Sequence, residues 1–440
     1  MNKKYHIITY GCQMNEHDSE NLAGMLEALD YEHTDSPEQA DVVVMNTCSV
    51  REHADKRFFG MLGQFKKRKM KDPEFIICVC GCMPQQPHIV QEIKESFHWV
   101  DIVFGTQTIA EFPNLLRERV ETGKKQFCIL ANNTEISEEK NPKRMHPHKA
   151  LVNITYGCNN FCTYCIVPYT RGREKSRTLR EVKQEVISLV HDGVKEVMLL
   201  GQNVNSFKDA EGNNFAALIR ALEEVEGLER IRFMTSHPKD LSDELIDCFR
   251  NGKKLCHNIH LPVQSGSDVV LKRMNRHYNR ERYMEIVKKL RAACPDITIS
   301  TDIIVGFPGE TEENFQDTLS LVREVEYDSA FTFIYSPRQG TPAAKFEDQI
   351  PETVKHDRFD RLVEAVNQCS MKKNAEYMDR IVDVMVDGPS KNDPSAWSGR
   401  TDTFKLVNFT SEVPLTAGEI VPVRITETKT FSLDGEKVTK

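Results

Sequence analysis

Roughly the first 120 residues alternate between short apolar runs and segments whose apolar residues recur at helical spacing. The apolar runs predict strands at residues 5–10, 41–47 and 75–81. The helical spacing between them predicts helices at residues 19–29 and 53–67. Because strands and helices alternate, this segment is expected to fold as a mainly parallel sheet flanked by helices.

The same alternation resumes near residue 150 with longer helices. The predicted strands are 151–155, 196–200, 230–235, 256–261, 297–304 and 329–335. The predicted helices are 178–192, 214–226, 241–250, 279–293 and 311–325. These units fall short of the eight strands of a closed barrel, so the pattern favours an open, partial (β/α)6 barrel.

The end of the chain carries short β runs separated by Gly and Asp turns, which predict a small β-barrel. The runs lie at residues 381–386, 403–409 and 419–428. The predicted fold class is therefore α/β, with an N-terminal parallel α/β domain, a partial barrel and a C-terminal β-barrel. Their predicted bounds are 3–121, 150–373 and 376–439, with a polar, proline-containing linker at 122–149.

Composition narrows the class of protein without naming a function. Hydrophobic residues make up 39% of the 440 and charged residues 28%, which is ordinary for a globular protein. No apolar run approaches the roughly 18 residues of a membrane span, and the N-terminus lacks the apolar core of a signal peptide. We therefore expect a cytoplasmic protein with no membrane contact. The net charge of −8 does not indicate a nucleic-acid binder, so RNA binding would need local basic patches.

Three cysteines, Cys158, Cys162 and Cys165, follow the first predicted barrel strand with the spacing C-x3-C-x2-C. Thiolates this close in a reducing compartment indicate a soft metal site. A four-iron cluster normally takes four cysteines, so three would leave one iron open to bind another molecule. A zinc site or unrelated thiols are the alternatives, but zinc ligands usually come in pairs and no second C-x2-C lies nearby.

Cys12, Cys48 and Cys82 each come just after one of the three predicted N-terminal strands. Ligand sites in open α/β sheets lie outside the carboxyl ends of the strands, so these thiols are expected to converge on one ion or cluster. Three separate buried thiols are the alternative. We expect the other cysteines to be structural: Cys78, Cys80, Cys128, Cys248, Cys256, Cys294 and Cys369.

A basic stretch directly follows the three-cysteine segment, with six cations and two anions between Arg171 and Lys183. Arginine suits phosphate because its planar guanidinium donates two hydrogen bonds and stays charged. We therefore predict that Arg171 and Arg173 bind RNA. A solvated helix start is the alternative, and it applies most readily to Arg180 and Lys183.

The C-x3-C-x2-C motif after a first barrel strand resembles that of radical S-adenosylmethionine (SAM) enzymes. With Cys12, Cys48, Cys82 and a terminal β domain, the whole chain resembles the methylthiotransferases, which combine a cluster domain, a radical core and a TRAM domain. Residues 10–15 and 156–172 are most similar to the MiaB group, the tRNA-2-methylthio-N6-dimethylallyladenosine synthases. The related ribosomal-protein enzymes usually have Lys at the position of Met14.

The resemblance implies a transferase that converts N6-isopentenyladenosine beside the tRNA anticodon to its 2-methylthio form. It implies two [4Fe–4S] clusters: one on Cys158, Cys162 and Cys165 that cleaves SAM to a radical, and an auxiliary one on the other triad that supplies sulfur. A second SAM would supply the methyl group. An electron donor such as flavodoxin or ferredoxin is implied as a partner. Position and analogy make three residues candidates to bind SAM or the nucleoside: Gln202, Ser236 and Gln264.

Other functions stay open at this point. A methylthiotransferase acting on threonylcarbamoyladenosine tRNA or on ribosomal protein S12 would keep the chemistry and change the substrate. A non-catalytic iron–sulfur RNA-binding protein would keep only the clusters. One feature fits tRNA binding poorly: residues 376–440 carry 8 Lys and Arg against 11 Asp and Glu.

Overall fold

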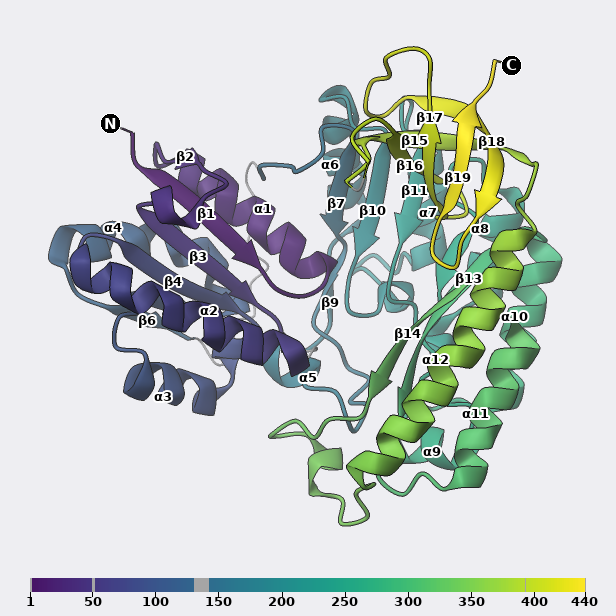
Figure 1. Cartoon of the computed structure of the whole chain (residues 1–440), viewed down its shortest axis with the longest axis horizontal. Coiled ribbons are helices and arrows are strands. Elements are labelled where there is room, and N and C mark those ends of the chain that lie inside the picture. The colour runs from purple at the N-terminus through teal and green to yellow at the C-terminus, as the bar shows by residue number, and fades with distance from the viewer. Residues whose placement is uncertain (1, 50–51, 130–141, 392, 440) are drawn as a thin grey trace. The chain divides into compact units, whose positions relative to one another are not determined.

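The computed structural model describes residues 2–49, 52–129, 142–391 and 393–439 (Figure 1). The chain forms two compact units. The first unit comprises Met1–Met145 and two later segments, Tyr156–Asn159 and Cys165–Lys175. The second comprises His146–Thr155, Asn160–Tyr164 and Ser176–Lys440. The segment after the first barrel strand is thus divided between the units.

The first unit contains a six-stranded sheet whose paired strands all run parallel. In spatial order its strands are β2 (Glu32–His33), β1 (Lys4–Thr9), β3 (Val42–Thr47), β4 (Ile76–Gly81), β5 (Ile102–Phe104) and β6 (Gln126–Cys128). The three predicted strands are confirmed as β1, β3 and β4. The other strands have two or three residues each, too few for a periodic pattern to reveal them.

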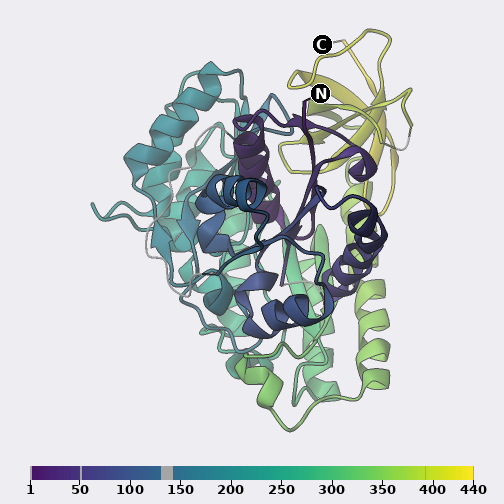
Figure 2. The ribbon, with the colours of Figure 1, turned by 90° about the vertical axis from the view of Figure 1, so that its left-hand side faces the viewer.

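Alternate residues of the sheet face two different layers of helices. Val42 and Val44 pack in one core with Leu22 and Leu26 of α1 (Gln13–Glu27), and α4 (Phe112–Thr122) joins the same core. The intervening strand residues pack against α2 (Glu52–Lys71) and α3 (Pro87–Ser96). Figure 2 shows α1 and α2 on opposite sides of this sheet. Successive strand side chains point to opposite faces, so both faces need apolar residues.

Helix α1 begins at Gln13, six residues before the predicted start at residue 19. Its first turns are polar, and their pattern resembles a loop. Yet Asn15, Asp18 and Glu20 are buried there because each accepts or donates hydrogen bonds inside the unit. Buried polar residues of this kind carry no hydrophobic signal, so the sequence pattern placed the helix start too late.

The second unit contains six parallel barrel strands in two hydrogen-bonded triplets. One triplet is β11 (Arg230–Phe233), β10 (Glu196–Leu200) and β7 (Lys149–Asn153). The other is β12 (Asn258–His260), β13 (Thr298–Val305) and β14 (Ser329–Ile334). An isolated parallel bridge between Ile231 and Leu255 links them. The predicted open, partial barrel is confirmed.

Helices surround these strands in the order that the sequence predicts (Figure 1). They are α6 (Leu179–His191), α7 (Phe215–Glu223), α8 (Asp243–Asn251), α10 (Arg280–Ala293), α11 (Glu312–Val325) and the long α12 (Glu352–Ala375). Shorter elements are β8 (Thr155–Tyr156), α5 (Val167–Thr170), β9 (Lys175–Ser176) and α9 (Asp268–Arg273). Among the helices in the described part of the chain, none combines the length and apolar character that a membrane crossing needs.

The C-terminal residues form a closed barrel, as predicted, with two strands that the sequence pattern missed. In spatial order the strands are β15 (Ile381–Pro389), β16 (Trp397–Thr401), β17 (Leu406–Thr410), β19 (Leu433–Lys437) and β18 (Ile420–Thr428). The missed strands, β16 and β19, contain Gly and several polar residues, so their apolar alternation is weak.

The C-terminal barrel contacts the N-terminal ends of the larger barrel's strands through buried arginines. The Arg232 side chain is fully buried, and its Nε lies 2.8 Å from Glu196 Oε2. Its Nη atoms donate to the backbone oxygens of Thr401 and Asp402, each at 2.7 Å. The neighbouring Arg230 donates to the Arg400 carbonyl at 2.8 Å. These charges are compensated and hydrogen-bonded, which is the condition for burying them.

We predict that Arg232→Met lowers the free energy of unfolding by about 3–5 kcal/mol, because Glu196 and the two carbonyls lose a buried partner. Thermal unfolding and protease sensitivity of the C-terminal barrel would measure the loss. Lys195→Met is the matched control, since the Lys195–Glu229 pair is about 40% exposed and is worth at most about 1 kcal/mol. Equal unfolding temperatures for the two variants would contradict the prediction.

Candidate active site

Cys12, Cys48 and Cys82 lie at the carboxyl ends of three strands that are neighbours in the sheet. Cys12 follows β1 and is the N-cap of α1, while Cys48 and Cys82 directly follow β3 and β4. Parallel pairing brings these ends to one edge of the sheet. The predicted placement of the three cysteines after their strands therefore agrees with the structure.

Two buried asparagines fix the loops that carry these cysteines. Asn15 Nδ2 donates to Asn46 Oδ1 at 3.1 Å and to the Thr47 carbonyl at 3.0 Å. Asn46 Nδ2 returns a hydrogen bond to the Asn15 carbonyl at 2.8 Å. The Cys82 backbone N–H donates to the Thr47 carbonyl at 2.8 Å. These bonds connect the segments that follow β1, β3 and β4, so the cysteine positions are set by the fold.

The thiols in this group influence one another's ionisation. A hydrogen bond with Cys48 lowers the pKa of Cys12 to about 6, against the effect of burial and with help from the Arg171 charge. Burial raises the pKa of Cys82, while Arg171 opposes that shift. A thiolate is the form that binds metal, so Cys12 is chemically ready to act as a ligand.

The Arg171 side chain is buried beside this cysteine group, within the first unit. Its Nη2 lies 2.8 Å from Asp18 Oδ2, and its Nε donates to Cys82 Sγ at 3.3 Å. Both side chains of the ion pair are 8% exposed. The guanidinium predicted to meet RNA is thus engaged inside the protein. Arg173, the second residue predicted to bind RNA, is exposed.

The three cysteines of the C-x3-C-x2-C motif are divided between the units, so each has its own surroundings. Cys158 and Cys165 are half-buried in the first unit. The Cys158 N–H donates to the Gly172 carbonyl at 3.1 Å. Gly157 has φ +69°, and a Cβ there would lie 2.3 Å from the Arg173 carbonyl oxygen, so the backbone requires glycine at this turn.

Cys162 lies in the second unit and is held by a segment that the sequence analysis did not single out. The Arg276 Nη1 donates to Cys162 Sγ at 3.4 Å, and its Nη2 donates to the Pro262 carbonyl at 2.8 Å. Thr163 N–H donates to the Met274 carbonyl at 3.1 Å. Asn275 Nδ2 donates to the Phe161 carbonyl at 3.1 Å and has φ +60°. Asn adopts a positive φ more readily than most residues, so Asn275 was the sequence feature that could have indicated this turn.

Arg276 stays charged although it is 4% exposed. Burial opposes the charge, yet Tyr164, Tyr278 and Cys162 hold the pKa of Arg276 well above its usual range. Each cysteine triad therefore has one member that accepts a hydrogen bond from a buried arginine: Cys82 from Arg171 and Cys162 from Arg276.

Polar residues lie together at the C-terminal ends of the barrel strands, and the short polar segments that follow these strands are called the rim motifs. Asn203 and Asn205, which follow β10, accept from the His237 N–H at 3.1 and 2.9 Å. Asn205 also donates to the His237 carbonyl at 2.9 Å. His237 follows β11, so the asparagines after β10 fix the turn after β11. The His237 pKa is lowered by burial and by Arg276, which keeps the imidazole neutral.

Several buried polar atoms at this rim have no hydrogen-bond partner among the described residues. They are Thr155 Oγ1, Ser236 Oγ and His237 Nε2. Buried polar groups are normally paired, so these three atoms make the rim a candidate ligand site. Ser236 was predicted as a binding residue, whereas Thr155 and His237 were missed because single polar residues after a strand look like turn chemistry.

Gln202 and Gln264 also lie after barrel strands but differ in exposure. Gln202 is half-buried after β10. Gln264 is 6% exposed with φ +70°, and its backbone pairs with β13 through hydrogen bonds with Asp302 and Ile304. A positive φ in a residue other than glycine costs free energy and is concentrated at functional sites.

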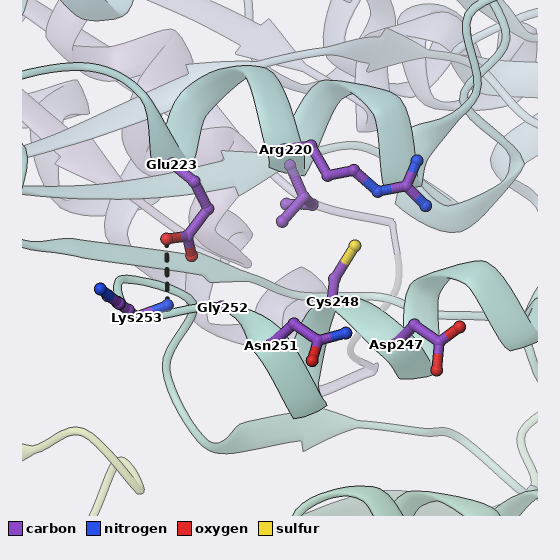
Figure 3. A pocket seen from close by; sticks show the side chains of 8 residues that line it. Arg220, Glu223, Asp247, Cys248, Asn251, Gly252 and Lys253 are labelled. Carbon is purple, nitrogen blue, oxygen red and sulfur yellow. Dashed lines mark hydrogen bonds between the residues drawn. The ribbon is translucent and has the colours of Figure 1, made fainter.

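The hollow between α7 and α8 is a separate feature on the outside of the barrel (Figure 3). The Glu223 carboxylate there accepts backbone N–H groups of Lys253, Lys254 and Leu255 at 2.8–3.2 Å. These bonds hold the turn before β12. The hollow is lined by helix residues and by this turn, not by the motifs at the carboxyl ends of the strands.

The donor set of the cysteine triads fits iron–sulfur chemistry. Ligands of one zinc ion lie about 3.8 Å apart, because Zn–S bonds of about 2.3 Å form a tetrahedron. Among the described residues, Cys12, Cys48 and Cys82 are not a group whose ligand atoms all lie within 4.8 Å of one another. A four-iron cluster is held by thiolates, so the all-cysteine donor set of these residues fits one.

Comparison with known proteins gives matches along most of the chain. Residues 152–322 match the Radical SAM superfamily, residues 4–105 match Uncharacterized protein family UPF0004, and residues 376–438 match the TRAM domain. A Clostridium tetani protein is 53% identical over 99% of this chain and 96% of its own length. A Clostridium perfringens protein (strain 13) is 53% identical over 100% of this chain and 98% of its own. Both are named tRNA-2-methylthio-N(6)-dimethylallyladenosine synthase.

The chain belongs to this family of synthases. The membership confirms the predicted resemblance to the methylthiotransferases. It makes the chain an enzyme of the transferase class within the radical SAM superfamily, whose cofactors are SAM and [4Fe–4S] clusters. The family names do not favour the alternative substrates considered from the sequence, nor a non-catalytic protein.

Solved structures with lower identity support the fold of this synthase-family chain. The radical SAM methyltransferase TsrM from Kitasatospora setae, with cobalamin and a [4Fe-4S] cluster bound, has a TM-score of 0.54 at 13% identity, covering 78% of this chain and 74% of its own. The cobalamin-dependent radical enzyme OxsB has a TM-score of 0.51 at 12% identity, covering 83% of this chain and 56% of its own. These likenesses concern the fold alone.

We predict that Asn15→Ala lowers the free energy of unfolding by about 1–3 kcal/mol, because it leaves buried hydrogen-bond partners unpaired. Hydrogen exchange should quicken in the segments that contain Cys12 and Cys48. Asn114→Ala is the control in the same unit: Asn114 is exposed, and its loss should change stability by less than about 0.5 kcal/mol. Unchanged exchange in the cysteine segments of Asn15→Ala would show that the asparagine pair does not hold them.

Proposed function

We propose that this enzyme converts N6-isopentenyladenosine beside the tRNA anticodon to 2-methylthio-N6-isopentenyladenosine. The observation that carries the proposal is the 53% identity, over 99% of the chain, to proteins named for this reaction. A cytoplasmic location follows from a tRNA substrate. The proposed domains keep their sequence-based bounds: 3–121 for the auxiliary cluster, 150–373 for the radical core and 376–439 for the TRAM domain.

We assign one [4Fe–4S] cluster to Cys158, Cys162 and Cys165 and an auxiliary one to Cys12, Cys48 and Cys82. When bound, the first would supply an electron that cleaves SAM, and the second would supply the sulfur. Both roles need an iron that has no cysteine ligand, and each triad leaves one such iron in its cluster. The supporting observations are the all-thiolate donor sets and the low pKa of Cys12.

The buried arginines act on the ligands themselves in this proposal. An N–H donated to a thiolate sulfur stabilises negative charge on that sulfur and fixes the ligand's orientation. Arg171 would do so at Cys82, with Asp18 holding the guanidinium in place. Arg276 would do so at Cys162, with the Pro262 carbonyl as its anchor.

The rim residues bind and orient SAM or the nucleoside in this proposal. Ser236, Gln202 and Gln264 keep the binding role predicted from the sequence. Thr155 and His237 join them because their buried polar atoms lack partners among the described residues. Nδ1 of the neutral His237 imidazole accepts from the Lys239 N–H at 3.2 Å, so its Nε2 carries the proton and can donate one hydrogen bond there without adding charge. A reductant protein such as flavodoxin or ferredoxin would deliver the electrons.

The proposed reaction is tested by expressing the chain in a bacterial strain that lacks this tRNA modification. Nucleoside mass spectrometry should show the methylthio form appearing and the isopentenyl form falling. Cys82→Ala should abolish the methylthio form and lower iron from about eight to about four atoms per chain, since four irons belong to each cluster.

Cys80→Ala is the matched control for this variant. Cys80 is also a fully buried thiol, two residues away inside β4, and its loss should leave both iron content and product unchanged. A wild-type chain that leaves the isopentenyl nucleoside intact would overturn the proposed reaction. Equal iron contents in Cys80→Ala and Cys82→Ala would overturn the assignment of the auxiliary ligands.

RNA contact remains part of the proposal for Arg171 and Arg173, and Arg173 gives the cleaner test because Arg171 also touches Cys82. We predict that Arg173→Ala weakens tRNA binding and lowers the slope of log K against log salt by about one, as loss of one phosphate contact does. Filter binding at several salt concentrations would measure both effects. Arg180→Ala, an exposed arginine at the start of α6, is the control; identical slopes for the two variants would remove Arg173 from the RNA surface.

A further inference from the structure

A third group of metal-ligand atoms lies in the second unit, away from the two cysteine triads in the sequence. His257 directly precedes β12, Cys294 is the C-cap of α10, and Asp296 lies between α10 and β13. Their ligand atoms all lie within 4.8 Å of one another, which no other group of three does among the described residues. His257 Nδ1 lies 2.9 Å from Asp296 Oδ1, and Cys294 Sγ lies 3.3 Å from the same carboxylate oxygen.

A fourth candidate ligand comes from the C-terminal barrel. Asp402 lies in the turn between β16 and β17, and its Oδ2 is 3.8 Å from His257 Nδ1. The turn is fixed on both sides: the Asp402 carbonyl accepts from Arg232 at 2.7 Å, and the Thr403 carbonyl accepts from Thr298 Oγ1 at 2.6 Å. This backbone places the Asp402 carboxylate beside His257, just outside the group whose ligand atoms all lie within 4.8 Å of one another.

The donor set fits zinc, which accepts sulfur, nitrogen and oxygen ligands together. Thiol and imidazole ligands together exclude calcium and magnesium, which take oxygen ligands. Bonds of about 2.3 Å to sulfur and about 2.0–2.2 Å to nitrogen and oxygen place the ligands of a tetrahedral zinc about 3.2–3.8 Å apart. The separations of 2.9 and 3.3 Å from Asp296 to His257 and Cys294 are close to this geometry. Asp402, 3.8 Å from His257 Nδ1, completes it by turning its half-exposed side chain toward the ion.

We propose that His257, Cys294, Asp296 and Asp402 bind one Zn²⁺ ion, which fastens the C-terminal barrel to the radical-SAM barrel. Four protein ligands make a closed, structural site with no position left for a substrate. The site lies at the N-terminal ends of β12 and β13, whereas the rim motifs follow the C-terminal ends of the strands. The zinc site therefore does not take part in the proposed reaction, and a failure of either proposal leaves the other untouched.

Binding requires defined protonation states. The Cys294 thiol becomes a thiolate and releases one proton to solvent, and His257 carries its proton on Nε2 so that Nδ1 is free for the metal. The side chain of Asp296 is 60% exposed and that of Asp402 48%, so an ion can enter from solvent without opening the core. Cys294 is 2% exposed and forms the inner wall of the site.

The test uses the full chain with its iron–sulfur clusters reconstituted. After incubation with zinc and removal of loosely bound metal, elemental analysis should find about one zinc per chain. X-ray absorption at the zinc edge should find one sulfur and three nitrogen or oxygen ligands. A chain without stoichiometric zinc would overturn the proposal. So would a zinc ion surrounded mainly by sulfur, because that ion would occupy cluster cysteines.

Cys294→Ala should lose the zinc and keep its iron, and zinc should no longer raise its unfolding temperature. Cys369→Ala is the matched control, since Cys369 is a buried thiol on α12 outside the group and its loss should leave zinc binding intact. Asp402→Asn, at a half-exposed turn, should fold normally and bind zinc at least tenfold more weakly. Zinc binding to Cys294→Ala or Asp402→Asn with wild-type affinity would contradict the proposed ligand set.

Discussion

The parallel pairing of β1, β3 and β4 determines where the first cysteine group forms. These strands are neighbours in the sheet, and each ends at the same edge with a cysteine immediately beyond it or a few residues on. Both sheet faces are filled by helices, so the strands cannot shift by one residue without moving apolar side chains out of both cores. The hydrogen bonds between Asn15 and Asn46 then fix the segments that follow β1 and β3 relative to each other. The placement of these three cysteines is a consequence of sheet register.

Buried positive charge is the second condition that both cysteine triads share. Thiolates carry negative charge, which is unfavourable in an apolar interior unless a cation or hydrogen-bond donor compensates it. Arg171 and Arg276 provide such donors to Cys82 and Cys162, and each is itself anchored by an oxygen acceptor. A guanidinium suits this place better than an ammonium because its planar fork reaches a sulfur and an oxygen together.

The sequence predicted those parts of the molecule whose signal is periodic. Strands and helices of the barrel, and the cysteines after β1, β3 and β4, follow from apolar spacing. Polar residues that are buried by their partners could not be found this way. The first turns of α1 looked like a loop because Asn15 and Asp18 are satisfied by distant segments. The burial of Arg171 depends on Asp18, which lies 153 positions away and has no sequence pattern that connects it.

The segment from Asn160 to Tyr164 shows why Arg276 was missed. Contacts between this segment and Arg276 span more than a hundred positions, and an arginine in a loop is usually solvated. The two positive-φ residues beside it, Asn275 and His277, mark a backbone that only tertiary contacts can maintain. Sequence patterns report the preferences of neighbouring residues, whereas the contacts around Cys162 join residues that are far apart in the chain.

The distribution of the two cysteine triads along the chain also affects how the protein matures. Cys158 and Cys165 are separated by so few residues that bringing the motif's thiols together costs little loop-closure entropy. Cys12, Cys48 and Cys82 approach one another only after β1, β3 and β4 have paired, which requires contacts of high sequence separation. The distributed triad exists only in a folded sheet, so a ligand that needs all three thiols can bind there only after the N-terminal unit has folded. The thiols of the local motif, by contrast, lie close together in the chain from the moment of synthesis.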